Sequence, residues 1–334
     1  MTDTDVRLRL PDGLAARPAR YRDDGSGPVG DPADLDAVLA LVRACETVTI
    51  GEQDSTRDEV EEMFRSPITD RLTTTMVHDG DTLVGFVWVE CDPTGGNTWI
   101  DVYVDPPRPD LVGAFIDFGR AVARAHRAAA SGSTTWRLRS GSYAQDVALA
   151  SAFEHHGLTR VRRFWRMRID LTSAGLPSSE PPLPDEVAIL DGRTEPVRRT
   201  LFETESAAFA DHWDHVERTY EEWLEYGTAR AGNDPDGWWL LTVGGAPAAV
   251  CIIDESRAET GDGYIRSLSV LREFRGRGLA KLLLRRAFVR YRDRGRLGVQ
   301  LGVDSESPTG ANHLYESVGM RPHRVIDAWE IPIE

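Results

Sequence analysis

Apolar and polar positions along the chain fall into blocks that predict alternating helices and strands. Near the N-terminus, Asp31 is suited to cap a helix, and Pro32 fits the first helical position. The apolar face of that helix is formed by Leu35, Val38, Leu39 and Val42. Residues 77–90 then alternate as a hairpin does, with a turn at Asp79-Gly80.

The second half of the chain repeats this order of elements. Residues 238–253 predict a hairpin that turns at Gly244-Gly245, and the segment ending at Val270 alternates as a strand does. A helix follows, because apolar residues recur at helical spacing at Leu279, Leu283, Ala287 and Tyr291. Gly295 supplies a C-terminal stop for that helix.

Residues 172–184 interrupt the periodic pattern. This stretch is rich in proline and small polar residues, which disfavour both a helix and a central strand. The sequence therefore predicts a linker there, an N-terminal domain over residues 1–171 and a C-terminal domain over residues 185–334. Two domains also agree with a length of 334 residues, at roughly 150 residues per domain.

The two halves resemble one another. Each opens with Leu-Pro-Asp, at residues 10–12 and 183–185. Residues 152–158 align with residues 314–320, which places Phe153 opposite Tyr315. Repeats of this length indicate duplicated domains rather than solenoid units.

Composition excludes several classes of protein. A net charge of −15 argues against nucleic acid or an anionic membrane as the main partner and permits a cationic substrate. No apolar run is long enough to span a bilayer, and the acidic first residues do not resemble a secretion signal. The three cysteines, Cys45, Cys91 and Cys251, are widely spaced, so we expect no disulfide framework and a cytoplasmic location.

The most informative segment joins the strand ending at Val270 to the helix that begins near Leu279. Residues 275–280 read Arg-Gly-Arg-Gly-Leu-Ala, which places glycines and free helical N–H groups where a phosphate can bind. A dinucleotide fingerprint requires a third glycine where Lys281 stands, and a P-loop requires Gly-Lys-Ser/Thr, so neither motif is present. Of the three phosphate-binding loops compared, the pyrophosphate loop of acyl-CoA-dependent transferases is the one that remains as a candidate.

This loop resembles the Arg/Gln-x-x-Gly-x-Gly/Ala motif of the GNAT superfamily of N-acetyltransferases. Residues 308–320 resemble the Ala-x-x-Leu-Tyr-Glu-x-x-Gly-Phe/Met helix of that family, and a predicted strand at 299–303 lies between the two motifs. The whole chain is similar to tandem GNAT proteins such as the mycothiol synthases. The resemblance implies an α/β (α+β) fold with two GNAT-like domains, each a mixed, mostly antiparallel central sheet flanked by helices.

The resemblance also implies roles for individual residues. Backbone groups of the strand end would pair with the pantetheine arm of acetyl-CoA, and loop amides would hold its pyrophosphate. Tyr315 would lie near the sulfur and act as general acid. The cofactor-binding set is then Leu268, Ser269, Val270, Arg275, Gly276, Arg277, Gly278, Leu279, Ala280, Lys281 and Asn312. Many relatives carry an asparagine in the region where Ser307 stands, which departs from the family pattern.

The general base stays open at this point, since the strand before the loop carries no carboxylate. Candidates are Glu203, Glu205, Asp211, His212, Asp214, His215 and Asp304, with a water relay as the alternative. Acceptors of the family commonly dock near residues 209–215. We therefore assign Glu203, Asp211, His212 and Trp213 to the substrate site. The two histidines show no third ligand, so no metal site is predicted.

The first half departs from the motifs that carry chemistry. Residues 105–113 contain prolines in place of the glycine pair, and proline has no amide N–H to offer a phosphate. Phe153 replaces the tyrosine and carries no acidic hydrogen. We expect this degenerate half to support structure or to shape the substrate site.

The sequence therefore predicts an acetyl-CoA-dependent N-acetyltransferase with its chemistry in the second half. The acetyl group would move to the primary amine of a small molecule by direct attack in a ternary complex. One alternative is an acetyltransferase like mycothiol synthase. Another is a non-catalytic acyl-CoA-binding regulatory protein, which an intact loop would also fit.

Overall fold

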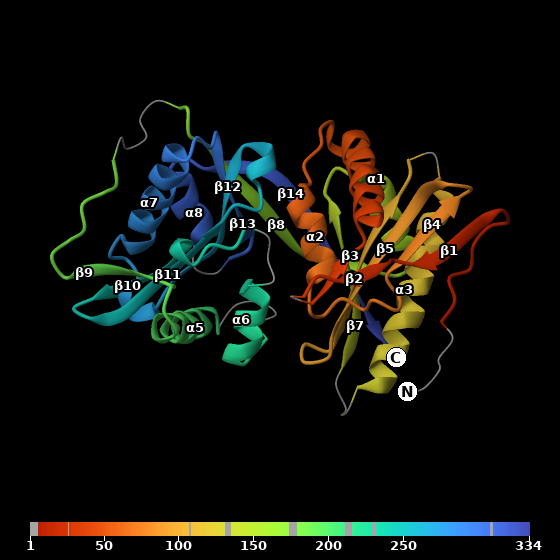
Figure 1. Cartoon of the computed structure of the whole chain (residues 1–334), viewed down its shortest axis with the longest axis horizontal. Coiled ribbons are helices and arrows are strands. Elements are labelled where there is room, and N and C mark those ends of the chain that lie inside the picture. Colours follow the sequence, from red (N-terminus) through yellow and green to blue (C-terminus); the bar gives the residue numbers. More distant parts are fainter. Residues whose placement is uncertain are drawn as a thin grey trace. The chain divides into compact units, whose positions relative to one another are not determined.

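The chain folds into two units of similar architecture (Figure 1). The computed structural model describes residues 6–25, 27–106, 108–130, 135–173, 179–210, 216–228, 232–307 and 310–334. Unit 1 comprises Met1–Phe164 with Val325–Glu334, and unit 2 comprises Trp165–Arg324. Each unit holds a mixed, mostly antiparallel sheet flanked by helices, which confirms the predicted fold class.

Unit 1 contains a sheet in the order β1-β4-β5-β6-β7-β14 and a separate hairpin of β2 and β3. Its strands before the crossing to unit 2 are β1 (Leu14–Pro18), β2 (Tyr21–Asp23), β3 (Pro28–Gly30), β4 (Thr75–Asp79), β5 (Thr82–Asp92), β6 (Asn97–Val104) and β7 (Trp136–Tyr143). Its helices are α1 (Pro32–Ile50), α2 (Arg57–Arg65), α3 (Asp110–Ala129) and α4 (Val147–His155). Only β6 and β7 run parallel within this sheet.

Unit 2 has the matching sheet order β9-β10-β11-β12-β13-β8. Its own strands are β9 (Val187–Asp191), β10 (Trp238–Val243), β11 (Ala246–Asp254), β12 (Asp262–Val270) and β13 (Gly298–Asp304). Its helices are α5 (Glu195–Phe209), α6 (Tyr220–Thr228), α7 (Leu279–Asp293) and α8 (Ala311–Ser317), with short 3-10 turns at Pro235–Gly237, Ala258–Thr260 and Arg272–Phe274. The order of elements from β9 to α8 repeats that from β1 to α4, apart from the β2–β3 hairpin, as the sequence repeats predict.

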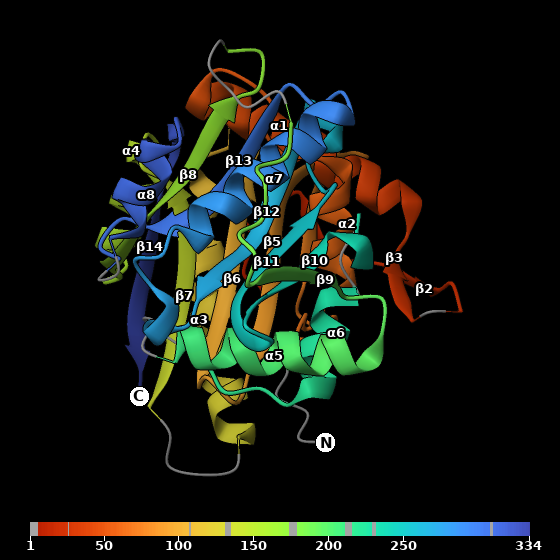
Figure 2. The same ribbon diagram turned by 90° about the vertical axis from the view of Figure 1, so that its left-hand side faces the viewer.

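The last strand of each half completes the sheet of the other unit. Strand β14 (Arg321–Ile333) ends the second half, yet it pairs with β7 in unit 1 (Figure 2). Strand β8 (Thr159–Asp170) ends the first half, and its side chains Met167 and Ile169 are buried in the core of unit 2. The division therefore differs from the predicted boundary at 172–184, because sheet pairing and not chain order decides where a strand belongs. Within that predicted linker, residues 174–178 lie outside the described part of the chain.

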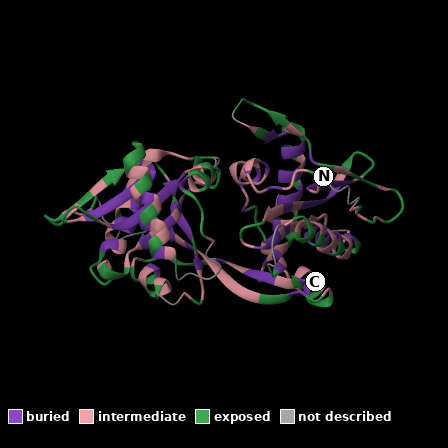
Figure 3. Cartoon of the chain, turned by 90° about the horizontal axis from the view of Figure 1, so that it is seen from below, coloured by how far each residue is buried: buried purple, intermediate pink, exposed green. Residues whose placement is uncertain are grey.

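Local sequence explains where the main helices begin and end. The Asp31 carboxylate accepts a hydrogen bond from the Ala33 N–H at 3.1 Å, so it caps α1 as predicted. Gly295, with φ of +75°, follows α7 in the left-handed conformation that ends helices. In both units burial is concentrated in the strands and in the helix faces that cover them (Figure 3).

In unit 2, α5 and α7 cover opposite faces of the sheet. Leu201 of α5 is buried against Val250 and Ile252 of β11, whereas the apolar face of α7 packs on the side where Ala249 and Cys251 point. Alternation along β11 explains this division, because successive side chains of a strand point to opposite faces. The sheet thus separates a core under α5 and α6 from a core under α7 and α8.

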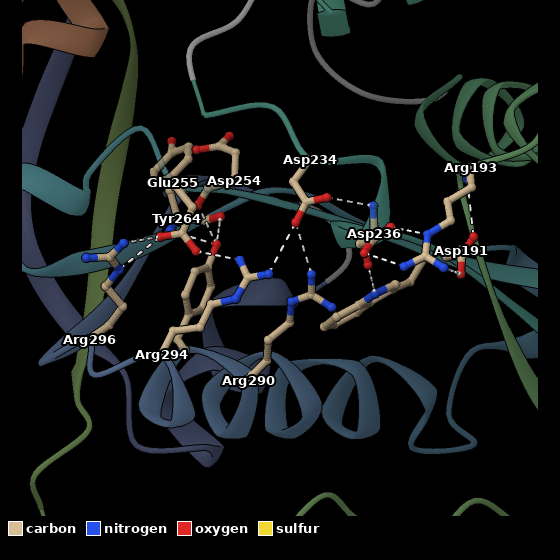
Figure 4. A network of polar contacts seen from close by, with 12 residues as sticks. Asp191, Arg193, Asp234, Asp236, Asp254, Glu255, Tyr264, Arg290, Arg294 and Arg296 are labelled. Carbon is tan, nitrogen blue, oxygen red and sulfur yellow. Dashed lines mark hydrogen bonds and ion pairs between the residues drawn. The ribbon is translucent and has the colours of Figure 1, made fainter.

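The C-terminal half of α7 is held by ion pairs shown in Figure 4. Arg290 and Arg294 each place a guanidinium nitrogen 3.2 Å from the Asp234 carboxylate. Glu255 accepts hydrogen bonds from Arg294 at 2.6 Å and Arg296 at 2.9 Å. Cations near the helix C-terminus also interact favourably with the helix dipole. These contacts fix the helix that presents its N-terminus to the glycine loop.

A close contact between Gly263 and Tyr291 packs α7 onto β12. A Cβ atom added at Gly263 would overlap the ring of Tyr291, so only glycine fits beneath this side chain. The Tyr291 hydroxyl donates to the Asp254 carbonyl at 2.6 Å and accepts from the Tyr264 N–H at 3.1 Å. The ring and its hydrogen bonds therefore set the separation between the helix and the strand.

We expect Gly263→Ala to lower the free energy of unfolding of unit 2 by about 1–3 kcal/mol, since an added methyl group overpacks this contact. Thermal and denaturant unfolding of the full chain measure the loss. Gly302→Ala on β13 is the matched control, because its added Cβ would meet nothing nearer than the Tyr264 hydroxyl at 3.5 Å. Equal stability of the two variants would contradict this account of the contact.

Candidate active site

The central feature of unit 2 is the point where β12 and β13 stop pairing. Their parallel ladder runs only from Asp262 opposite Gly298 to Ile265 opposite Leu301. Beyond Ile265, β12 continues to Val270 paired with β11 alone. One edge of this stretch is therefore open to an extended ligand, as the sequence predicts for the strand before the glycine loop.

A β-bulge at Arg266 marks the start of the open stretch. The register with β11 changes there, from Ile253 opposite Ile265 to Ile252 opposite Ser267, which leaves Arg266 as the extra residue. Its guanidinium Nε donates to the Asp254 carboxylate at 2.7 Å. The residue pattern of the strand does not predict this bulge.

Because of the bulge, side chains beyond Arg266 alternate between two different environments. Leu268 and Val270 pack against the core under α7. Ser267 and Ser269 point to the other face, where the Ser267 hydroxyl donates to the Glu205 carboxylate of α5. The two sides of the open strand thus have different chemistry, one apolar and one polar.

Glu205 is the carboxylate that the structure brings to the open strand. Besides the Ser267 hydroxyl, it accepts a hydrogen bond from the indole N–H of Trp223 on α6 at 2.6 Å. Three elements therefore fix its position. Its location follows from helical spacing, because Glu205 comes four residues after the fully buried Leu201.

Not every predicted acceptor-site residue joins this group. Glu203 is exposed on α5, since it lies two residues from both Leu201 and Glu205 and so faces away from the sheet. Asp211, His212 and Trp213 lie outside the described residues, as do Asp214 and His215. Trp223 and Ser267 were not among the predicted residues. The two serines spaced by two near the end of the strand were the available indication.

The glycine loop leads into the N-terminus of α7. Gly276 and Gly278 have φ of +75° and +78°, and an added Cβ at either position would meet nothing within 4 Å. Gly278 caps the helix without a side-chain hydrogen bond, so the first helical N–H groups have no acceptor within the described chain. The Arg275 guanidinium donates to the Val270 carbonyl at 3.1 Å and ties the loop to the strand. Free amides, cationic side chains and a helix dipole together suit an anionic diphosphate.

Tyr315 of α8 lies on the opposite face from Glu205. Its side chain is buried in the core under α7, and its hydroxyl has no hydrogen-bond partner among the described residues. Burial, with a smaller contribution from the Cys251 thiol, raises the pKa of Tyr315 well above its usual value near 10. The hydroxyl therefore stays protonated at neutral pH.

Asn312 stands one turn before Tyr315 on α8. Its amide N–H donates to the Ser305 carbonyl at 2.9 Å, which holds the loop before the helix. Its buried Oδ1 has no donor within the described residues and is available to a ligand N–H. In the same described part of the chain, no group of three or more His, Cys, Asp or Glu side chains is placed to hold a metal ion.

Comparison with known proteins identifies the family of this chain. The acetyltransferase (GNAT) family model matches residues 198–320. A mycothiol acetyltransferase of Thermobispora bispora is 31% identical over 301 residues, which cover 86% of this chain and 92% of the relative. The chain belongs to the GNAT acetyltransferase family. It is therefore an acyltransferase, and acetyl-CoA is its co-substrate.

Other relatives match over most of the chain. A mycothiol acetyltransferase of Streptomyces avermitilis is 27% identical and covers 87% of this chain and 90% of its own. A GNAT structure from Sphaerobacter thermophilus superposes with a TM-score of 0.76 at 25% identity, covering 98% of each chain. A tandem GNAT protein from the clavulanic acid biosynthesis pathway shares the fold, with a TM-score of 0.71, 15% identity and coverage of 96% and 99%. Within the described residues, no helix has the length and apolar character needed to cross a bilayer.

Unit 1 keeps the GNAT scaffold but differs in several of these features. Its β6 pairs with β5 in unbroken register, so it has no bulge, and Asp101 stands three residues before the strand end, as Ser267 does in β12. Burial raises the pKa of Asp101 to about 6. At the start of α3, Arg108 pairs with Asp110, which places a carboxylate in the first helical turn. Pro107 of this loop lies outside the described residues.

We expect Gly278→Glu to abolish acetyl-CoA binding while unit 2 stays folded, because the new side chain puts bulk and negative charge at the helix N-terminus. Calorimetric titration with acetyl-CoA measures the loss. Gly245→Glu in the β10–β11 turn is the matched control, since its φ of +83° imposes the same backbone strain in equally open space. Undiminished affinity in folded Gly278→Glu would refute the assignment of the loop.

Proposed function

We propose that unit 2 transfers the acetyl group of acetyl-CoA to the primary amine of a small molecule by direct attack in a ternary complex. The observation that carries this proposal is the contact between Glu205 and Ser267, which fixes a carboxylate beside the open stretch of β12. Tyr315 stands on the other face of the same sheet. A thioester lying along the open edge would have a proton acceptor on one side and a proton donor on the other.

The open strand and the glycine loop would bind acetyl-CoA. The pantetheine arm would pair with the backbone from Leu268 to Val270 in the manner of an added strand, as the predicted cofactor set requires. The pyrophosphate would accept hydrogen bonds from the loop amides, with Arg275, Arg277 and Lys281 supplying positive charge. Asn312 would offer its free Oδ1 to an N–H group of the arm.

The proposed acetyl transfer uses groups on both faces of the sheet. The neutral amine attacks the thioester carbonyl, a C–N bond forms, and a strand N–H between 268 and 270 stabilises the oxyanion. Glu205 takes the proton that the amine loses, directly or through the Ser267 hydroxyl. The C–S bond then breaks, and Tyr315 protonates the departing thiolate. Solvent returns a proton to the tyrosinate and accepts one from Glu205.

Two features restrict the proposal to unit 2. In unit 1, Phe153 occupies the position of Tyr315 and is fully buried against Trp329, so this unit has no acid at that point. Its loop has prolines at 106 and 109, where unit 2 offers amide donors. We therefore propose a supporting role for unit 1 and one productive acetyl-CoA per chain.

The acceptor is a small molecule with a primary amine. The relatives in Thermobispora bispora and Streptomyces avermitilis are named mycothiol acetyltransferases, so the amine acceptor of mycothiol formation is the first compound to test. Release of coenzyme A across a panel of primary amines that includes this acceptor tests the function. Absence of amine-dependent release would favour the alternative of an acyl-CoA-binding protein.

We expect Tyr315→Phe to lower kcat by about 10²–10⁴-fold with nearly unchanged affinity for acetyl-CoA, because the lost hydroxyl acts only when the thiolate departs. Steady-state kinetics at neutral pH and calorimetric titration measure the two quantities. Wild-type turnover in this variant would exclude Tyr315 as the acid.

Glu205→Gln is expected to lower kcat at neutral pH by about 10²-fold or more, since the amide can still accept from the Trp223 N–H and donate to the Ser267 oxygen but cannot take a proton. Part of the rate should return as the pH rises, because more of the amine then arrives already deprotonated. Glu203→Gln on the same helix is the matched control and should behave as wild type. Equal pH–rate profiles for the two variants would rule out Glu205 as the base.

A further inference from the structure

Two serines of β12 lie on the face of the sheet that α5 covers, and only one of them makes a hydrogen bond within the described residues. The Ser267 hydroxyl donates to Glu205. Ser269 is 7% exposed, and its hydroxyl has no hydrogen-bond partner among the described residues. A buried hydroxyl without a partner is costly, so such groups are rare unless a ligand completes them.

The surroundings of Ser269 leave one direction for a partner. On β11 it lies opposite Val250, whose apolar side chain offers no hydrogen bond. On the other side β13 has already diverged, since its pairing with β12 ends at Ile265. Neither neighbouring strand therefore supplies a partner to the Ser269 hydroxyl, which lies on the face of the sheet that Glu205 occupies.

Side-chain alternation separates this hydroxyl from the proposed path of the cofactor. The pantetheine arm would pair with the strand backbone in the plane of the sheet. Ser269 points out of that plane toward α5, the face from which Glu205 approaches, whereas Leu268 and Val270 point toward α7. A ligand group that reaches Ser269 belongs to the molecule bound on the Glu205 face.

We propose that Ser269 hydrogen-bonds a second polar group of the acceptor and so determines acceptor specificity. Residues two apart on a strand are separated by about 7 Å. The acceptor is then a primary amine that carries a hydroxyl, ether or carbonyl oxygen at about that distance from its nitrogen. This inference rests on the proposed function, because it takes the amine to be bound beside Glu205 and Ser267.

The test compares straight-chain ω-amino alcohols with n-alkylamines of the same length as acceptors for the full chain. In the wild type, the ratio of kcat/KM for the amino alcohol to that for the alkylamine should peak at one chain length. Ser269→Ala should lower this peak ratio about 2- to 10-fold, the usual net worth of one hydrogen bond, by raising KM for the amino alcohol. Any effect of Ser269→Ala on the cofactor or on the basal rate acts on both amine series alike, so the ratio between the series is the readout.

Two further variants separate recognition from structure. Ser269→Thr keeps a hydroxyl and should keep the peak. Ser140→Ala removes a second buried serine hydroxyl that has no partner within the described residues, on β7 of unit 1, and should leave the ratio unchanged. A change in stability alone would move Ser140→Ala and Ser269→Ala together.

The outcomes distinguish this inference from the function on which it rests. Equal ratios in the wild type and Ser269→Ala, with both amine series acetylated, would overturn the role of Ser269 and leave the proposed function intact. A raised KM for acetyl-CoA in Ser269→Ala, with no change in the ratio, would assign the hydroxyl to the cofactor instead. Failure of the wild type to acetylate either series or the mycothiol-type acceptor would overturn the proposed function and this inference with it.

Discussion

The functional architecture of unit 2 depends on one interruption of hydrogen bonding, the end of the β12–β13 ladder at Ile265 and Leu301. The backbone N–H and C=O groups of β12 that no longer pair with β13 need other hydrogen-bond partners once a ligand excludes water. The amide groups of an extended ligand can provide them. The bulge at Arg266 then determines which side chains face each side of the opening. A carboxylate and two serines come to lie on one face, and a buried tyrosine lies on the other. The chemistry thus follows from backbone geometry before any catalytic side chain is considered.

Unit 1 contains a similar interruption in its sheet. Strands β6 and β7 also stop pairing early, at Ile100 and Ser140. Here the hydroxyl of Tyr143, at the end of β7, donates to the Asp54 carboxylate at 3.1 Å and lies 3.3 Å from that of Glu46. These side chains connect the end of the strand to α1 and the segment after it. The contact has no counterpart among the hydrogen bonds described at the end of β13 in unit 2.

The sequence predicted those features that depend on neighbouring residues. The caps of α1 and α7, the hairpin turns at Gly80 and Gly244, and the glycine loop all follow from residues close together in the chain. The duplication and the fold class were also predicted, since both halves repeat one order of elements. Pairing between distant segments was not predictable in this way. The short outer strands β1 and β9, the bulge at Arg266 and the contact of Glu205 with Trp223 all depend on it. Glu205 had been one of seven open candidates for the base, and burial of its helix face is what distinguishes it from Glu203.

Neither half, made alone, would have a complete sheet, because β14 completes unit 1 and β8 completes unit 2. Two copies of such a half can complete each other's sheets by exchanging their last strands, which is the arrangement of a symmetric, domain-swapped dimer. When the two copies are joined in one chain, the strands are exchanged within that chain. The two copies then no longer need to have the same sequence. Each unit then depends on the last strand of the other half for its complete sheet. That strand is therefore constrained by the sheet it joins, whatever the rest of its own half does.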